Sequence, residues 1–188
     1  MKKLLVINGS IAGGSKNCGI VISLLPKLTS MSVTTFHLAE GVDSNKLNSA
    51  IVEADALLLV TGTYWDSCGS PLQKFLEDFS HLDGSPDVVG KPLGVVVLHH
   101  EIGGKMVLSR LQGVMSSMGF LIPPMTGVVL ARASFEDNDS YGFVDLDVLL
   151  ANLEKASECK IPWSYWKVET DGYDGIWADQ VREVKELV

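Results

Sequence analysis

The residue types best suited to bind an anion follow the first apolar stretch of the chain. Residues 4–7 are apolar, and residues 9–17 are rich in glycine and serine. Three glycines in this loop, at positions 9, 13 and 14, permit tight turns. Its hydroxyl and amide side chains belong to Ser10, Ser15 and Asn17. Because the first N–H groups of a helix lack internal partners, such a loop at the start of a helix predicts a phosphate site.

Two later loops also carry polar or aromatic side chains directly after apolar runs. Residues 61–69 include Tyr64 and Trp65, and residues 99–104 begin with His99 and His100. Ligands of open α/β sheets bind outside the carboxyl ends of the strands. We therefore expect one ligand to contact all three loops, with a phosphate on the first and a flat ring between the other two. Packing of the two aromatic residues within a surface loop is the alternative.

The segments that must position these loops alternate between strand and helix patterns. Strands are expected at residues 4–7, 32–38, 56–60, 92–98 and within 120–132, with 32–38 at an edge. Helices are expected at residues 18–28, 44–54, 72–79, 105–118 and 145–158, and a polar loop at 136–142. Ser70 is the expected N-cap of the third helix, with Pro71 at its first position. This alternation predicts a three-layer α/β fold with a doubly wound, parallel, five-stranded sheet.

Composition indicates a single globular domain and disfavours several classes of partner. The chain has 188 residues, of which 46% are hydrophobic and 20% charged. Its net charge of −8 opposes binding to nucleic acid. No apolar run approaches the roughly 18 residues of a membrane span. The three cysteines are widely spaced and form no Cys-x-x-Cys pair, so we expect neither a disulfide framework nor a metal site, and a cytoplasmic location.

Three segments carry a resemblance to a known family. Residues 8–17, Asn-Gly-Ser through Ser-Lys-Asn, resemble the motif G-S-x-R-x-x-S-x-N, and residues 54–76 resemble A-D-x-hydrophobic-T-P-x-Y-x-x-S-x-P-x-x-L-K-x-F-L-D. Gly-Lys-Pro at residues 90–92, followed by Gly103-Gly104 and a helix, is similar to a third block. These three motifs occur in this order in the NADPH-dependent FMN reductase family of flavodoxin-like proteins, which the chain therefore resembles. The resemblance spans residue 1 to about residue 155.

The resemblance implies a flavodoxin-like sheet with strand order 2-1-3-4-5, FMN as cofactor, and NADPH or NADH as electron donor. The residues implied for the phosphate are Ser10, Ser15, Lys16 and Asn17. Those implied for the flavin ring are Thr61, Thr63, Tyr64 and Trp65 on one side and His99, Ile102, Gly103 and Gly104 at the pyrimidine edge.

Two positions depart from the family pattern. The arginine of the phosphate loop is absent, with Ala12 or Gly13 near its place, and Gly62 replaces the usual proline. Losing one charge-assisted contact costs about 1.5 to 3 kcal/mol, whereas micromolar binding corresponds to about 8 kcal/mol. We therefore expect FMN binding to be weakened but retained, with Lys16 substituting in part.

The activity implied by the resemblance is two-step hydride transfer from NAD(P)H to a quinone, free flavin or similar small acceptor, with ping-pong kinetics. The cofactor performs the chemistry, so no side chain is assigned as a nucleophile. His99 and His100 are candidates for a proton donor. Backbone amides at residues 102–104, aided by Lys105, are expected to stabilise negative charge.

The sequence also bears on two other functions. The first loop nearly matches the nucleotide motif G-x-x-x-x-G-K-[ST], but Ser15 separates Gly14 from Lys16 and Asn17 replaces the magnesium-binding hydroxyl, which disfavours an NTPase. A noncatalytic flavodoxin-like FMN-binding or electron-carrier protein stays open as the alternative, because such carriers share the acidity and the phosphate loop.

Residues 160–188 form a C-terminal extension of the single domain expected over residues 1–188. The extension carries Trp163, Trp166 and Trp177, three of the four tryptophans. Residues 161–168 suit an extended segment, and the residues after them suit a final amphipathic helix. Aromatic residues favour interface cores, so the extension either covers its own domain or packs in a homodimer, and a homodimer is expected.

Overall fold

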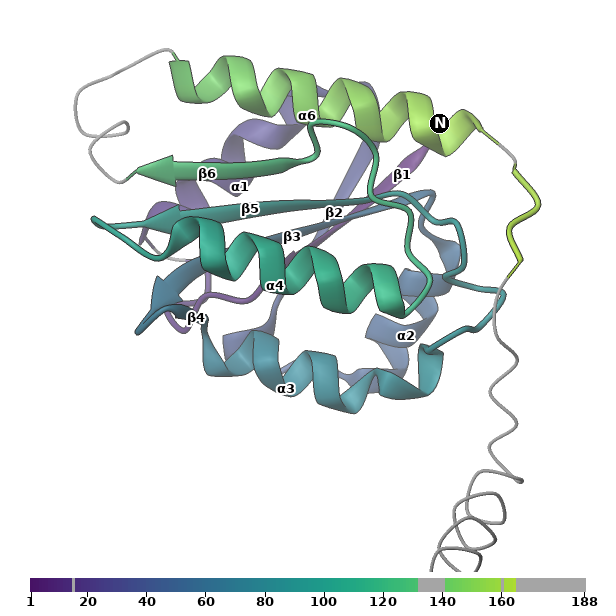
Figure 1. The fold of residues 1–188 in the computed structure, drawn as a ribbon, viewed down its shortest axis with the longest axis horizontal. Coiled ribbons are helices and arrows are strands. Elements are labelled where there is room, and N and C mark those ends of the chain that lie inside the picture. The colour runs from purple at the N-terminus through teal and green to yellow at the C-terminus, as the bar shows by residue number, and fades with distance from the viewer. Residues whose placement is uncertain (15, 132–140, 160, 165–188) are drawn as a thin grey trace, which may run out of the picture.

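A parallel sheet with helices on both faces forms the molecule (Figure 1). The computed structural model describes residues 1–14, 16–131, 141–159 and 161–164. Its strands are β1 (Lys3–Asn8), β2 (Ser32–His37), β3 (Ala56–Tyr64), β4 (Ser67–Cys68), β5 (Leu93–His99) and β6 (Gly127–Ala131). Its α-helices are α1 (Lys16–Leu28), α2 (Ser44–Glu53), α3 (Ser70–Asp78), α4 (Gly104–Ser117) and α6 (Tyr141–Glu158), and two short 3₁₀ turns are η1 (Leu38–Glu40) and η2 (Ser80–Leu82).

The strand order is β2-β1-β3-β5-β6, and all neighbours in this order are parallel. The predicted doubly wound sheet with its 2-1-3-4-5 order is therefore confirmed, with β4 added as a short antiparallel partner of β3. The chain leaves β1 toward β2 and later returns to the other side of β1 to form β3. Ligand sites in such sheets lie at this reversal, beyond the carboxyl ends of the strands.

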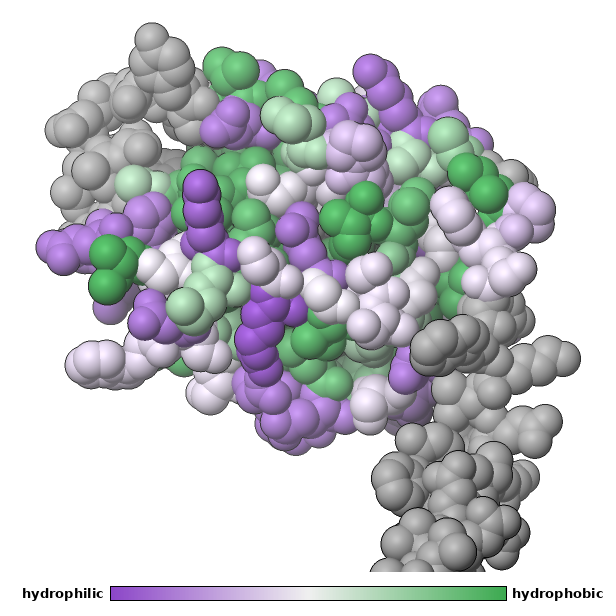
Figure 2. Space-filling model, in the orientation of Figure 1, coloured by the Kyte–Doolittle hydropathy of each residue, from purple (hydrophilic) through white to green (hydrophobic). Residues whose placement is uncertain are grey.

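Alternate residues of the central strands fill two separate cores. On one face, Leu4 and Val6 of β1 join a cluster with buried residues of α1 and α6. On the other face, Leu5 and Ile7 join a cluster with α2, α3 and α4. Both faces of β1 are buried, which explains why its sequence is continuously apolar. The outer surface formed by α3 and α4 mixes hydrophilic and hydrophobic side chains (Figure 2).

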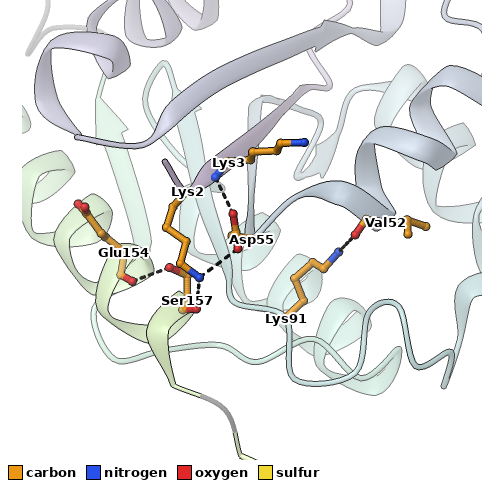
Figure 3. A network of polar contacts seen from close by, with 7 residues as sticks. All are labelled: Lys2, Lys3, Val52, Asp55, Lys91, Glu154 and Ser157. Atoms are coloured by element: carbon orange, nitrogen blue, oxygen red, sulfur yellow. Dashed lines mark hydrogen bonds and ion pairs between the residues drawn. The ribbon is translucent and has the colours of Figure 1, made fainter.

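Asp55 forms hydrogen bonds that connect segments at the amino-terminal end of the sheet (Figure 3). Its carboxylate accepts hydrogen bonds from the Lys3 N–H at 2.7 Å and from Lys2 Nζ at 3.1 Å. Lys2 Nζ also donates to the Ser157 carbonyl at the end of α6, at 3.0 Å. Lys91 Nζ donates to the carbonyls of Ile51 and Val52, which end α2. These contacts join β1, β3, α2 and α6 at the end of the sheet opposite the reversal loops.

The segment expected to be a loop at residues 61–69 is a β-hairpin, which corrects the sequence-based boundary. β3 continues to Tyr64, and β4 pairs with it through Thr63 with Cys68 and Tyr64 with Ser67. Trp65 and Asp66, with φ of 49° and 58°, form the turn. Two consecutive residues with positive φ are typical of a type I′ hairpin turn. The sequence rule failed here because neither residue is the glycine that usually marks this turn.

Two element boundaries also differ from those expected. The N-cap of α3 is Gly69 rather than Ser70, which is the first helical residue. Gly69 is required because a Cβ there would lie 2.6 Å from the Gly9 carbonyl oxygen. Helix α6 begins at Tyr141, inside the expected polar loop 136–142.

The described part of the C-terminal extension is short and irregular. Residues 161–164 have no regular secondary structure, and the half-exposed Trp163 ring lies against Gly90. The rest of the predicted extended segment and the predicted final helix lie outside the described residues. Among the residues that are described, no helix is long and apolar enough to cross a bilayer, and no group of metal-ligating side chains is assembled.

Candidate active site

A cavity of about 300 Å³ lies at the carboxyl ends of β1, β3 and β5, beside the reversal in strand order. One wall is the β1–α1 loop, and the other is formed by the ends of β3 and β5. The residues that line it are Ser10, Ile11, Ala12, Lys16, Asn17, Cys18, Gly62, Thr63, Tyr64, Leu98, His99 and His100. This is the place where a doubly wound fold binds its ligand.

Asn8, the last residue of β1, organises the first wall. Its side chain is fully buried, and its Oδ1 accepts a hydrogen bond from the Ser10 N–H at 3.0 Å. Its Nδ2 donates to the Gly13 carbonyl at 2.7 Å and contacts His37 Nδ1 at 2.9 Å. Because an amide nitrogen can only donate, His37 Nδ1 is the acceptor. The amide thus joins both ends of the loop to the neighbouring strand β2.

The backbone of the loop turns most of its N–H groups toward internal acceptors. The Ala12 N–H donates to Ser10 Oγ at 3.2 Å, and the Gly13 N–H donates to the Ser10 carbonyl at 3.2 Å. The Gly14 N–H donates to Glu40 Oε1 at 2.8 Å. The first turn of α1, which begins at Lys16, adds N–H groups that have no partner within the helix and could face a ligand.

The loop packs tightly on α1. A Cβ at Gly19, in the second turn, would overlap the Gly14 carbonyl oxygen, so only glycine permits this approach. Lys16 has a φ of 65°, a left-handed conformation that is uncommon for a residue with a side chain. Such outliers concentrate at functional sites, where the surrounding structure holds them in place.

Tyr64 and two histidines form the second wall. Tyr64 Oη lies 3.4 Å from Ser10 Oγ, so the two walls meet at the base of the cavity. His99 Nδ1 is buried and has no hydrogen-bond partner among the described residues. A buried polar atom without a partner costs about 1 to 3 kcal/mol.

Cys18 lies in the first turn of α1 and also lines the cavity. Burial raises the pKa of its thiol to about 11, and a hydrogen bond with Ser10 opposes this shift only in part. The thiol is therefore protonated at neutral pH. Because the thiolate is the nucleophilic form, Cys18 acts here as a small apolar wall residue.

The structure brings together seven of the residues implicated by the sequence. Those along the cavity are Ser10, Lys16, Asn17, Thr63, Tyr64, His99 and His100. Others lie elsewhere: Thr61 is fully buried and donates to the Gly62 carbonyl, Trp65 is fully exposed at the hairpin turn, and Ile102 is exposed. Gly103 and Gly104 form the start of α4 rather than the cavity wall. Ser15 lies outside the described residues.

Sequence reasoning missed several wall residues. Ile11, Cys18 and Leu98 carry no polar signal, although the position of Leu98 at the end of an apolar strand could have indicated it. The roles of Asn8 and Glu40 were also missed, because their bonds join segments that are distant in sequence.

The walls fit a ligand with an anionic end and a flat, hydrogen-bonding ring, as in FMN. At the loop end, the first N–H groups of α1 and the Lys16 ammonium can accept a negative group. At the other end, the side chains of Tyr64, His99 and His100 line the cavity beside the place for a ring. The donor set is therefore compatible with FMN, although the phosphate end has few donors.

Solved structures with the same fold are numerous. RosB with bound 8-demethyl-8-formylriboflavin-5'-phosphate matches with a TM-score of 0.69 at 17% identity, over 84% of this chain and 79% of RosB. The apo NADH:FMN oxidoreductase EMOB matches with a TM-score of 0.63 at 17% identity, over 86% and 92% of the two chains. FerB, an NAD(P)H:acceptor oxidoreductase from Paracoccus denitrificans, gives 0.62 at 18% identity, over 83% and 99%. Identities this low establish a common fold.

The family assignment comes from the sequence. Comparison with curated proteins gives no significant match. The profile of the NADPH-dependent FMN reductase family, however, matches residues 2–134. This range contains β1 to β6 and every residue that lines the cavity. The chain therefore belongs to the NADPH-dependent FMN reductase family.

Proposed function

We propose that this NAD(P)H-dependent FMN enzyme reduces a quinone, a free flavin or a similar small acceptor by ping-pong hydride transfer. The observation that carries the proposal is the cavity at the sheet reversal, between a loop that can accept an anion and a wall of Tyr64, His99 and His100. Its volume of about 300 Å³ is at the lower end of the range for ligand sites. A site of this size favours one substrate at a time beside a bound cofactor.

Residues of the first wall would hold the phosphate. Lys16 supplies the positive charge, Ser10 and Asn17 supply polar side chains, and the start of α1 supplies N–H groups. We also assign Ser15 to this group, from its place in the loop motif. Ser10 is held for this role because its own N–H is bonded to Asn8, which fixes the direction of the loop.

Residues of the second wall would position the ring. Thr63 and Tyr64 flank one side, and His99 and His100 border the other. Bound FMN would supply the hydride chemistry, accepting a hydride from NAD(P)H and passing it to the acceptor. The amides of residues 102–104, at the start of α4, would stabilise negative charge on the reduced ring. Either histidine can supply a proton to the reduced acceptor.

Steady-state kinetics test this proposal. With NADPH and a quinone varied together, we expect parallel double-reciprocal plots, because the two substrates use the cavity in turn. Replacing Ser10 and Ser15 together by alanine should weaken FMN binding. Intersecting plots would show a ternary complex. A protein whose bound FMN is never reduced by NADPH would instead be the electron carrier.

We further propose that residues 1–188 form one domain with a C-terminal extension and that two copies associate. Three exposed apolar side chains support an interface at this end of the sheet: Ile11 at the cavity, and Trp65 and Ile102 in the turns after β3 and β5. The free cysteines Cys18, Cys68 and Cys159 support a reducing, cytoplasmic location. Light scattering at micromolar concentration should give the mass of a dimer, and truncation after Lys160 should give a monomer with altered acceptor preference. If the full-length protein is monomeric, or if the truncated protein stays dimeric with unchanged kinetics, the extension does not contribute to the dimer interface or to acceptor preference.

A further inference from the structure

We infer that Glu40 is a specificity-determining residue that lowers the preference of the site for the flavin phosphate, so that the protein binds riboflavin almost as well as FMN. The inference rests on the proposed placement of the phosphate at residues 10–17. Glu40 comes from η1, after the edge strand β2, and its carboxylate accepts the Gly14 N–H of the phosphate loop at 2.8 Å.

The loop has few donors left for a phosphate. The N–H groups of Ser10, Ala12, Gly13 and Gly14 all donate to acceptors within the protein. A loop that binds phosphate through its backbone must direct such groups at the ligand. Here the Glu40 carboxylate takes the place of an external anion at one of them.

The charges at the loop also disfavour phosphate binding. Ala12 or Gly13 stands near the place of the motif arginine, and Lys16 is the single lysine or arginine that lines the cavity within the described residues. The Glu40 carboxylate accepts a hydrogen bond from the Gly14 N–H, two residues after Ala12. The loop therefore lacks the positive charge of the motif, and a carboxylate lies against it. Opposite charges strengthen hydrogen bonds to a phosphate, and like charges oppose its binding.

The residues proposed to contact the flavin ring differ from those proposed to hold the phosphate. Tyr64, His99 and His100 line the cavity, whereas Glu40 is not among its lining residues, and only Tyr64 contacts a residue of the phosphate loop, through Ser10 Oγ. Binding energy should therefore come mainly from the ring, which FMN and riboflavin share. We expect their dissociation constants to differ by no more than about tenfold in the wild-type protein. The corresponding free-energy difference is smaller than the contribution of one charge-assisted hydrogen bond.

The experiment measures FMN and riboflavin affinity by fluorescence titration in four proteins. These are the wild type, Glu40→Gln, Ala12→Arg and the control Glu53→Gln. Glutamine at position 40 can still accept the Gly14 N–H, so the loop keeps its bond and only the charge is lost. Glu53 lies on α2 and pairs with Lys3 at 3.0 Å, far along the chain from the loop, and its substitution changes the net charge equally.

We expect Glu40→Gln to raise FMN affinity by about two- to fivefold, because an exposed charge has a modest effect that salt screens. Ala12→Arg should raise FMN affinity by about tenfold or more. Neither change should alter riboflavin affinity, which also serves as the test of correct folding, and Glu53→Gln should alter neither. The gain from Glu40→Gln should shrink at high salt.

Three results would overturn the inference. One is a wild-type protein that prefers FMN to riboflavin by clearly more than about tenfold. Another is a Glu40→Gln variant whose FMN affinity is unchanged or reduced. The third is a change of equal size for both flavins, which would indicate a purely structural effect. Each of these leaves the proposed oxidoreductase function intact, whereas failure of the wild-type protein to bind either flavin contradicts that function and the inference together.

Discussion

Replacing Asn8 by aspartate should both destabilise the protein and weaken its flavin site. The substitution keeps the size of the side chain and the oxygen that accepts the Ser10 N–H. It removes the donor that Asn8 offers to the Gly13 carbonyl and to His37 Nδ1, at 2.7 and 2.9 Å. Because the side chain is fully buried, water cannot replace these partners.

The size of the effect follows from these contacts. The lost hydrogen bond to the Gly13 carbonyl, and the burial of a carboxylate against that carbonyl oxygen, bring the cost to about 3 to 5 kcal/mol, although His37 can change tautomer and donate to the new carboxylate. For a chain of this length, each kcal/mol lowers Tm by about 2 to 4 °C, so the expected decrease is about 6 to 20 °C. Loss of the Gly13 contact also frees the phosphate loop, and FMN affinity should fall by more than about tenfold.

Thermal unfolding followed by circular dichroism and a flavin titration give the two readouts. Asn45→Asp is the matched control, because Asn45 is an exposed residue in the first turn of α2. An acidic residue there is mildly favourable, by about 0.3 to 1 kcal/mol. If Asn8→Asp melts and binds flavin like the wild type, the buried amide does not organise the loop.

Three further predictions concern other parts of the chain. Because burial raises the pKa of Cys18 to about 11, its contribution to stability is complete below the unfolded pKa of about 9 and is lost as pH rises toward 11. Unfolding at a series of pH values should show a loss of about 2 to 3 kcal/mol in this window, absent in Cys18→Ala. Burial acts to raise the pKa of Asp55, but the Lys3 and Lys2 hydrogen bonds and the charges of Lys2 and Lys91 hold it below its usual value. Its contribution is therefore present above about pH 4 and lost in more acidic solution, and Asp55→Asn should lower Tm at neutral pH by about 2 to 4 °C and weaken the acid dependence. Gly19→Ala should displace the Gly14 carbonyl and lower FMN affinity by about tenfold or more, while Gly113→Ala on α4, where a Cβ meets open space, should stabilise the protein by up to about 1 kcal/mol and leave binding unchanged.

The sheet was predictable because its central strands are buried on both faces. Leu4 to Ile7, Ala56 to Val60 and Leu93 to Leu98 are uninterrupted apolar runs, and each contributes to both cores. The order of the strands came from the resemblance, since periodicity carries no information on which strands are neighbours. The hairpin after β3 was missed because Trp65 and Asp66 adopt positive φ without glycine, a choice that local propensity disfavours.

Within the site, the lining residues that belong to the sequence motifs were predictable. The residues that hold the loop in place through hydrogen bonds were not. Ser10, Lys16 and Asn17 follow an apolar strand and begin a helix, a pattern visible in the sequence. Asn8 contacts His37, and Glu40 accepts the Gly14 N–H, and these two contacts become evident only when β1 and β2 are placed side by side. The unpartnered nitrogen of His99 likewise depends on packing rather than on residue type.

An anaerobic titration of the FMN-loaded protein with NADPH tests the central claim most directly. We expect stoichiometric loss of the visible flavin absorbance, followed by its full return when a quinone is added after NADP⁺ is removed. That result would establish both halves of a ping-pong cycle at one site. Flavin absorbance that NADPH leaves unchanged, or that returns only when NADP⁺ and quinone are present together, would contradict the account.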